Sequence, residues 1–567
     1  MSQRSDALTV ALTGQLTLIL AVSAVLALAA SFLLLLFYRR AVIKSMLRRS
    51  RSEILEPTGF LPPEPEHKPN DAPLHFAFAA RATAPLNQDA AMLYRRANRR
   101  QKLAAFVQII AGCCFAATMT AAFLIAGKMD FALFRFLFYA WANAWPVVIT
   151  VDLVVGLSRR GKVVVALVYF VIGAIIGAMY RAKIPGMPIG QLLYVWLDTN
   201  AVPTLLLLIF FNRRIRAVGP MVLVFMLLGV TGASVAARLI SNNQKLLRAV
   251  DNFILSIGLG TSSTVIALHL IGFAAFAILG WLVLEWLRRL YEKKYISEQS
   301  INVDTMWLVF GIVNSINLVF QARLWIFSGL VAFVVYKFIA AGLYRVLATA
   351  RRTKSQGYRL LLLRVFALGK RSETLYNTLG KSWRTVGSIQ MIAGPDLATS
   401  TVEPHEFMDF ISGKLSRRFI DTGRTLDLRI DHMDLWADGD GQFRVSEFFC
   451  HDDTWKIALA RLADESDAVL MDLRGFSQRH SGCAFEINEL FNLVPLQRVV
   501  FAMDDTTDQP FMQRTMQAAW KNLKDRSPNH RLRAGTVTLV QLPRNDGTRD
   551  LLFALCAAAS KDVGAKN

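Results

Sequence analysis

The sequence predicts an α-helical membrane domain with about nine spans, followed by an α/β domain with a mainly parallel, helix-covered sheet. Hydrophobic residues make up 54% of the 567 residues, charged residues only 19%, and the mean hydropathy is +0.37. Such values are typical of proteins with several membrane spans. After Tyr344 the pattern changes, because short apolar runs alternate with amphipathic segments. This alternation is typical of a parallel sheet with helices on both faces.

Nine apolar runs approach the roughly 20 residues that cross about 30 Å of hydrocarbon. They are 16–38, 103–125, 131–157, 163–180, 192–211, 220–240, 264–287, 306–320 and 324–344. Each must be helical, since backbone amides find no water inside lipid. No small-residue cleavage site follows the first run, so we interpret it as an uncleaved anchor.

The distribution of Lys and Arg predicts the orientation of these spans. The net charge is +22, and residues 39–102 carry 13 Lys and Arg against 6 Asp and Glu. Basic clusters also occur at 158–162, 212–216 and 288–294, and after 344. Basic residues favour cytoplasmic loops. We therefore expect a bacterial inner (plasma) membrane protein with its N-terminus outside and its C-terminal domain in the cytoplasm. The basic charge implies contact with the lipid bilayer, and no nucleic acid partner is expected.

The predicted organisation has five parts. They are an anchor span (1–38), a basic, Pro-rich cytoplasmic loop (39–102), a multi-span helical domain (103–344), a linker (345–357) and a cytoplasmic α/β domain (358–567). The segment "PTGFLPPEPEHKPNDAP" within the loop is typical of a flexible linker.

Five polar residues fall within or near the apolar runs, namely Asp198, Asp152, His269, Asn314 and Asn317, and the first three are ionisable. Ionisable groups in lipid are costly and often mark an ion or substrate path, which favours a transporter or channel regulated by the tail. The alternative is that they join helices through hydrogen bonds. The five cysteines show no metal-ligand spacing, and we interpret "DGDG" (438–441) as a turn rather than a calcium loop.

The tail predicts an ordered series of strands and helices. Strands are expected at 358–368, 387–393, 425–431, 442–449, 467–473, 498–504 and 536–542. Helices are expected at 372–383, 404–420, 452–465, 483–494, 509–523 and 549–560. Ligands of such sheets bind beyond the carboxyl ends of the strands. The segments after the first strand and after 467–473 are therefore the candidate binding loops.

The stretch "DAVLMDLRGFSQRHSGCAFEINEL" (467–490) carries the strongest candidate motif. Its Cys483-Ala-Phe-Glu486 resembles the Cys-x-x-Glu of TIR domains, with Gly482 where Trp is usual. Asp472 followed by Gly482-Cys483-Ala-Phe-Glu486 is similar to the corresponding segment of nucleoside deoxyribosyltransferases. The whole chain also resembles bacterial multi-span membrane proteins of unassigned function that carry "MDLRGF" in their tails.

These resemblances imply a site for a nucleotide-type ligand, with NAD as a ligand or substrate. Glu486 would be catalytic at the glycosidic carbon of NAD or of a nucleoside. The other implied site residues are Asp472 for ribose hydroxyls, Arg474 for phosphate, Phe476 for stacking on a base, and Arg371 and Ser372 lining the same crevice. The structural alternative for Glu486 is a favourable interaction with the helix dipole, worth ~0.3–1 kcal/mol.

Three functions therefore compete. The first is a membrane sensor or effector whose tail binds a nucleotide-type ligand and in one form cleaves its glycosidic bond. The second is the tail-regulated transporter or channel. The third is a non-catalytic TIR-like signalling module that self-associates, as a homo-oligomer, without turnover.

Overall fold

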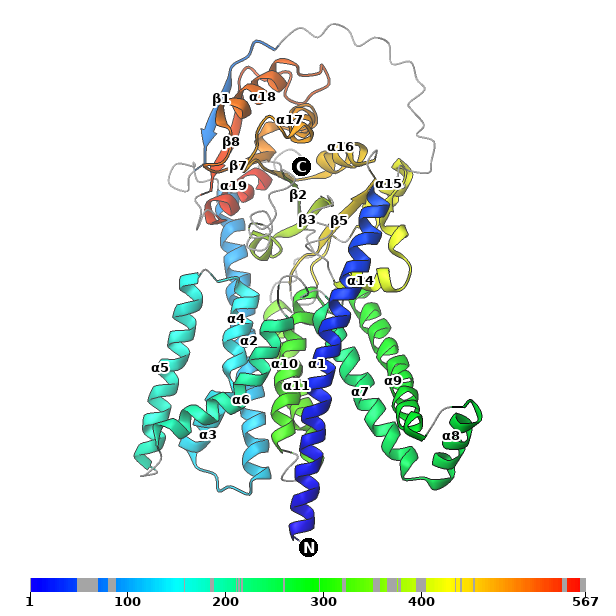
Figure 1. Cartoon of the computed structure of the whole chain (residues 1–567). Helices are drawn as coiled ribbons and strands as arrows, with labels where there is room; N and C mark the ends of the chain where they lie inside the picture. The colour runs from blue at the N-terminus through cyan, green and yellow to red at the C-terminus, as the bar shows by residue number, and fades with distance from the viewer. Residues whose placement is uncertain are drawn as a thin grey trace.

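The structure is a computed structural model of the whole chain. It describes residues 2–47, 70–79, 88–157, 159–183, 188–210, 212, 215, 218–258, 261–294, 296–318, 323–349, 357–364, 375, 379–393, 404–433, 435–438, 441–451, 454–542 and 548–560. A bundle of long helices carries the α/β domain on one of its ends (Figure 1). This arrangement confirms the division into a helical part and a C-terminal parallel sheet.

Seven described helices are long and apolar enough to cross a membrane. They are α1 (Ser2–Met46), α2 (Gln88–Ala126), α5 (Arg159–Lys183), α6 (Ile189–Phe210), α7 (Gly219–Ser241), α9 (Thr261–Glu292) and α11 (Ser328–Thr349). The pair α3 (Leu133–Asn143) and α4 (Trp145–Val155) meets at a 41° bend and forms an eighth span if counted together. The short helix α8 (Gln244–Ser256) precedes α9.

The predicted count of nine spans is not confirmed. Helix α10 (Glu298–Leu318) contains most of the predicted span 306–320 but is not among the membrane-length apolar helices. Its polar residues, Asp304 and Asn314 among them, lower its hydropathy. Several of its apolar residues, including Met306 and Trp307, are instead buried against neighbouring helices. The helix therefore lies inside the bundle, where a less apolar sequence is tolerated.

The α/β domain is built on an eight-stranded parallel sheet with the order β1-β8-β7-β6-β2-β3-β5-β4. The strands are β1 (Leu74–Phe78), β2 (Tyr358–Arg364), β3 (Gly387–Ala393), β4 (Phe419–Ile420), β5 (Val445–Cys450), β6 (Ala468–Asp472), β7 (Val499–Met503) and β8 (Gly535–Gln541). The helical segments are α14 (Pro404–Ile411), η2 (Leu415–Arg418), α15 (Gly423–Asp431), α16 (Trp455–Glu465), α17 (Ser481–Leu493), η3 (Leu496–Arg498), α18 (Gln509–Lys521) and α19 (Thr548–Ser560).

The strand order contains a topological switch point between β2 and β6. From β2 the chain builds outward through β3 and β5, then returns and builds the other half through β6, β7 and β8. These six strands follow the 3-2-1-4-5-6 order of doubly wound dinucleotide-binding sheets. β2 and β6 are adjacent, with Arg364 paired to Asp472 in register. The carboxyl ends of these two strands therefore mark the place where such sheets bind ligands.

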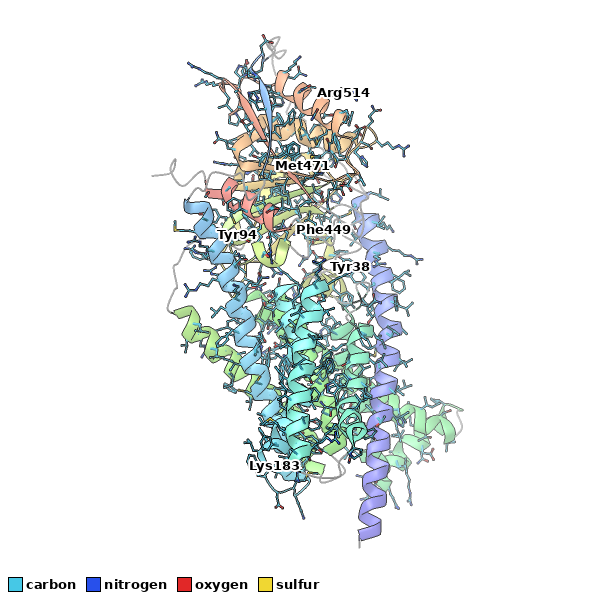
Figure 2. All side chains as sticks on the ribbon, turned by 90° about the vertical axis from the view of Figure 1, so that its left-hand side faces the viewer. Tyr38, Tyr94, Lys183, Phe449, Met471 and Arg514 are labelled. Carbon is cyan, nitrogen blue, oxygen red and sulfur yellow. The ribbon has the colours of Figure 1, made fainter. Side chains whose placement is uncertain are left out.

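Helices cover both faces of the sheet, and two of them come from the membrane part. One face packs on α16, α17 and α18. The other packs on α19 and on Leu93 and Ala97 near the start of α2. Beyond it, Tyr38 and Val42 of α1 join a core with Phe449 of β5. Figure 2 shows Tyr38 and Phe449 at the level where the bundle meets the domain. The ends of α1 and α2 are thus part of the packing of the α/β domain.

Three segments differ from the sequence-based predictions. Residues 404–420, predicted as one helix, form α14, η2 and the edge strand β4. Leu74–Phe78, within the predicted loop 39–102, forms β1 and pairs with β8 from Leu74↔Gly535 onward. Residues 425–431, predicted as a strand, lie in α15. Thr422 caps this helix through the backbone N–H of Thr425, and Leu426 and Ile430 share its buried face. The apolar spacing of this segment fits both periods, and the cap together with i, i+4 burial favours the helix.

Candidate functional site

The candidate site lies at the carboxyl end of β6, next to the switch point. Asp472 is the last residue of β6 and is 2% exposed. Arg474 follows it in the loop and donates from Nε to Oδ1 at 2.8 Å and from Nη2 to Oδ2 at 2.7 Å. Its backbone N–H also donates to Oδ1 at 3.2 Å. Asp472, predicted to bind ribose, and Arg474, predicted to bind phosphate, therefore bind each other in a closed, bidentate pair.

Asp504 adds a second buried carboxylate, one strand away, that the sequence analysis did not single out. It follows β7, and its Oδ1 accepts hydrogen bonds from the backbone N–H and hydroxyl of Thr506 at 2.9 and 2.5 Å. Thr507 donates to the carbonyl of Leu473 at 3.0 Å, which joins the loops after β6 and β7. The signal in the sequence was an acid directly after a buried strand, the same pattern that marks Asp472.

The charges of these carboxylates act on Arg474. Burial alone would lower the pKa of Arg474, but the hydrogen bonds and charge of Asp472, with the charge of Asp504, raise it above its usual value. The guanidinium is thus held in its charged form by the protein itself. A ligand phosphate would have to compete with Asp472 for the same donors.

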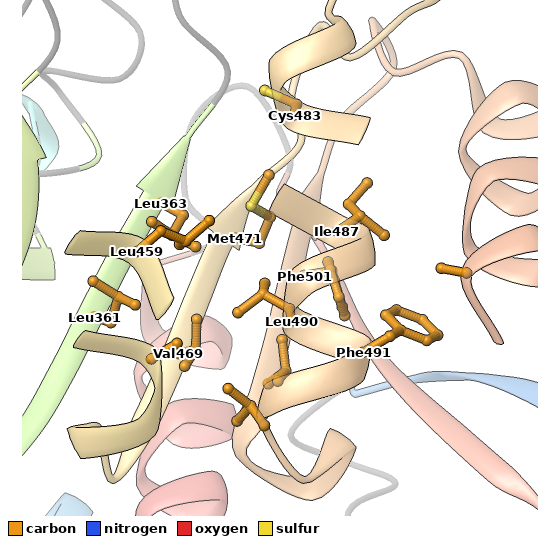
Figure 3. Packing of buried hydrophobic residues seen from close by; sticks show 14 of the residues in the cluster. Leu361, Leu363, Leu459, Val469, Met471, Cys483, Ile487, Leu490, Phe491 and Phe501 are labelled. Carbon is orange, nitrogen blue, oxygen red and sulfur yellow. The ribbon is translucent and has the colours of Figure 1, made fainter. Parts of the chain in front are cut away.

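Glu486 lies inside the domain. It is in the second turn of α17 and is 3% exposed. Figure 3 shows this helix beside β6, and its residues Cys483, Ile487 and Leu490 belong to the same hydrophobic cluster as Met471. Cys483 of the Cys-x-x-Glu motif is therefore a core residue, 2% exposed. Glu486 belongs to the helix that follows the loop after β6, and it is buried.

Phe476 is fully enclosed, which differs from its predicted role as a stacking platform. Its exposed fraction is 0%, and its ring lies 5.3 Å from that of Phe511 and 6.4 Å from that of His480. The left-handed backbone of Gly475, with φ of 72°, directs the chain into this turn. The face of Phe476 is thus used by the core and is not presented to a base.

Ser477 and His480 are partly exposed and flank the exposed Gln478 and Arg479 in the same loop. The Nδ1 atom of His480 lies 3.2 Å from both the backbone nitrogen and the hydroxyl oxygen of Ser477. Because the backbone N–H can only donate, Nδ1 accepts and His480 carries its proton on Nε2 when neutral. Arg371 and Ser372, the remaining predicted site residues, lie outside the described residues.

The three predicted intramembrane polar residues occupy different environments. Asp152 pairs with Lys162 at 2.6 Å at the end of α4, and its backbone carbonyl accepts from Lys381 of the α/β domain. It therefore lies where the bundle meets the domain, not in mid-span. Asp198 is exposed on α6, and α6 continues through Pro203 without a break. His269 is exposed on α9.

The polar residues that are buried within the bundle differ from the three predicted ones. Asn200, two positions after Asp198, is fully buried and donates to the carbonyls of Ala142 and Trp196 at 3.0 Å each. It joins α6 to the bend between α3 and α4. Asp304 of α10 pairs with Lys337 of α11 at 2.6 Å. Neither the position of Asn200 on the helix face nor the partner of Asp304 could be read from hydropathy, because both depend on how the helices pack.

The described residues contain no group of three or more His, Cys, Asp or Glu side chains arranged for a metal ion. Gly441 adopts φ of 82°, and its N–H donates to the carbonyl of Asp438 at 2.9 Å, as expected for a turn. Asp438 itself binds Arg444. Its carboxylate is thus engaged by a guanidinium in this structure.

At the carboxyl ends of β6 and β7, two buried carboxylates can accept hydrogen bonds from a polar ligand. Asp472 and Asp504 are acceptors that suit hydroxyl donors such as those of ribose. Glu486, on the helix after the β6 loop, is a third buried acid of the domain. No protein-family model, curated protein or solved structure matches this chain.

Proposed function

We propose that the chain is an integral membrane sensor or effector whose α/β domain binds a nucleotide-type ligand, NAD or a nucleoside, at the β2–β6 switch point. The observation that carries this proposal is the strand order, since doubly wound sheets bind ligands where it reverses. Asp472 stands at that point, and Asp504 follows the next strand. Both are oriented by hydrogen bonds before a ligand arrives.

The proposed setting is a bacterial inner membrane with the α/β domain in the cytoplasm. Basic residues at the ends of helices near the domain support this orientation. Arg39 and Arg40 lie near the end of α1 that enters the domain, and Lys293 and Lys294 follow α9. Lys183, the last residue of α5, lies at the opposite end of the bundle (Figure 2), and residues 181–191 of the sequence carry only two basic residues.

The ends of α1 and α2 provide a physical route between ligand and membrane. Both helices run from the bundle into the packing of the domain. Arg100 of α2 donates to the carbonyl of Thr385, just before β3, at 2.8 Å. A ligand that shifts the strand ends relative to α1 and α2 would change the positions of these membrane helices. Such a coupling is what a sensor or effector requires.

The test uses the full-length protein in nanodiscs. NAD and adenosine are titrated, and binding is measured by isothermal calorimetry and by the rise in melting temperature. We expect Asp504→Asn to weaken binding at least tenfold, because a ribose hydroxyl would lose a charged acceptor. Asp525→Asn, an exposed acid after α18, is the control and should bind as the parent does. If the folded protein binds neither NAD nor adenosine, the proposal is refuted.

Cleavage of the ligand is a finer form of the same proposal. It requires Glu486 to reach the glycosidic carbon, and burial of this residue means that α17 or its preceding loop must open first. Nicotinamide release from NAD, followed by chromatography, tests it. If Glu486→Gln releases nicotinamide as fast as the parent, Glu486 is not catalytic; if the parent binds without release, the domain is a binding module.

A further inference from the structure

A second charged site lies between the membrane bundle and the α/β domain. A cavity of about 410 Å³ opens between the end of α9, the segment α14–η2, α15 and the first half of β5. Its lining carries five Lys and Arg side chains and two carboxylates. The cations are Arg288, Lys414, Arg418, Arg429 and Arg444, and the carboxylates are Asp409 and Glu447.

Three of the five cations are neutralised by described carboxylates. Asp409 lies between Arg288, at 3.3 Å, and Arg418, at 2.6 Å. Arg418 also reaches the buried carboxylate of Glu406 at 3.5 Å. Arg444 holds Asp438 at 3.0 and 3.1 Å and lies 4.0 Å from the ring centroid of Tyr291. These arginines connect α9, α14 and β5 and already have anionic partners.

Arg429 and Lys414 differ from the other three. Arg429 donates to the backbone carbonyls of Arg418 and, at 2.9 Å, of Glu447. Neither Arg429 nor Lys414 has an ion pair with any carboxylate of the described part of the chain. Burial, and next the positive charge of Arg418, lower the pKa of Arg429 to about 10. A guanidinium that forms no direct ion pair with a described carboxylate, and that has spare N–H donors, therefore lines the cavity, although the charges of Glu406 and Asp409 act on it from a distance.

We propose that this junction cavity binds a phosphate group, held by Arg429 and Lys414. A guanidinium recognises phosphate oxygens through paired N–H donors, and a lysine adds a mobile point charge. The phosphate belongs either to the headgroup of an anionic lipid or to a soluble phosphate compound. Its position favours a lipid, because basic pockets at the cytoplasmic ends of membrane helices bind anionic headgroups. This site is separate from the switch point and does not depend on it.

Binding of an anion here would act on the junction itself. Arg288 belongs to α9, whereas Arg418 and Arg429 belong to the α/β domain. A phosphate among them would reduce the repulsion between Arg418 and Arg429 and strengthen the contact between the two parts. We therefore expect the ligand to raise the melting temperature of the whole chain and not only to occupy the cavity.

The experiment compares the full-length protein in nanodiscs of phosphatidylcholine with and without 30% phosphatidylglycerol, on the order of a bacterial content of anionic lipid. A parallel arm titrates inorganic pyrophosphate into the phosphatidylcholine nanodiscs. A rise of several degrees with phosphatidylglycerol alone identifies a lipid headgroup, and a rise with pyrophosphate identifies a soluble phosphate. No rise in either arm overturns the proposal.

Lys414→Gln is the deciding variant, because its side chain forms no hydrogen bond or ion pair with the described residues. It should fold normally and lose at least half of the rise, while pyrophosphate affinity falls about tenfold. Arg429→Gln should lose the rise completely, although it also removes two bonds to backbone carbonyls. Lys521→Gln removes the same charge from the far end of α18 and should keep the full rise. Equal rises in Lys414→Gln and Lys521→Gln would assign the effect to general surface charge and refute the site.

Discussion

Two buried arginine sites at different places on the same domain differ in how their charges are matched. At the switch point, both carboxylate oxygens of Asp472 bind Arg474, and the pKa of Arg474 is raised. At the junction, Arg429 binds only backbone carbonyls, and its pKa is lowered to about 10. At the first site a carboxylate pairs directly with the guanidinium, whereas at the second no described carboxylate does, and Glu406 and Asp409 act on Arg429 only from a distance.

This difference assigns different ligand chemistry to the two places. A closed Asp–Arg pair offers acceptors and suits hydroxyl groups, but it offers few donors to a phosphate. An arginine without a carboxylate suits an anion. The resemblance to TIR and nucleoside deoxyribosyltransferase segments implied Arg474 for phosphate. Arg429 is the candidate that we propose instead, since it forms no direct ion pair with a described carboxylate.

The largest expected effect comes from breaking the junction network. Arg418→Ala leaves Glu406, whose side chain is 1% exposed, without its guanidinium partner and uncovers Asp409. Removing one member of a buried ion pair costs about 3–5 kcal/mol. We expect a large fall in melting temperature in nanodiscs. The control Arg461→Ala removes exposed ion pairs on α16 and should cost roughly 0–1 kcal/mol. Equal falls in the two variants would mean that the network does not stabilise the junction.

A smaller effect is expected at the switch point. Asp472→Asn keeps the shape of the side chain but replaces a charged acceptor of Arg474 with a neutral one. We expect a loss of about 1.5–3 kcal/mol of stability, the range for hydrogen bonds to charged groups. Thermal unfolding at pH 7 measures it. If Asp472→Asn costs as much as Arg418→Ala, the two sites are not as different as their geometry indicates.

His451 joins the end of α1 to the edge of the sheet, and its loss should cost less again. Its Nδ1 lies 2.8 Å from the carbonyl of Ser45 and its Nε2 lies 2.8 Å from Asp421. Its ring also stacks on Phe419 at 5.1 Å. His451→Phe keeps the ring and removes both bonds, so we expect about 1–2 kcal/mol. Hydrogen exchange should rise at residues 41–47 and not in α17; a rise in α17 as well would indicate general unfolding.

The smallest effect, and the most specific probe of the junction, is thiol reactivity. Burial raises the pKa of Cys450 and of Cys556 to about 12, so almost no thiolate forms at pH 8. In a Cys113→Ser, Cys114→Ser background, we expect neither to react with maleimide over minutes, as measured by intact mass. Arg418→Ala should expose Cys450, which lies at the junction, before Cys556. The reverse order would place the weakest contact at α19.

These two thiols also predict how stability depends on pH. Because the folded pKa is raised above the ordinary value of 9.0, the neutral thiols contribute stability below about pH 9. That contribution is lost as the pH rises toward 12. Unfolding followed at pH 8 and pH 10 should therefore show lower stability at pH 10. A Cys450→Ala, Cys556→Ala variant should show a smaller difference.

Much of the domain was predictable because each buried strand of a parallel sheet is a short apolar run. Residues 387–393 form β3 as predicted, and 467–473 and 498–504 contain β6 and β7. The edge of the sheet was harder to predict. β1 is a strand of five partly exposed residues directly after a Pro-rich segment, and its role depends on pairing with β8. The helix at 425–431 was missed because a short alternating segment fits two periods.

The candidate site was likewise predictable only in part. Strand ends identified Asp472 and Arg474, and the helix after them contained Glu486. Sequence could not show that Arg474 turns back onto Asp472, or that Phe476 packs against Phe511, because side-chain directions depend on neighbouring loops. Nor could it show the junction cavity, whose arginines come from segments between residues 288 and 444.

By itself, the sequence determined that apolar helices precede a helix-covered parallel sheet, because hydrophobic length and periodicity are local properties. Only the tertiary structure decided that α1 and α2 extend into the domain and that α10 is internal. It also decided which arginine lacks a carboxylate. These features depend on which distant side chains meet, and a pattern along one segment does not carry that information.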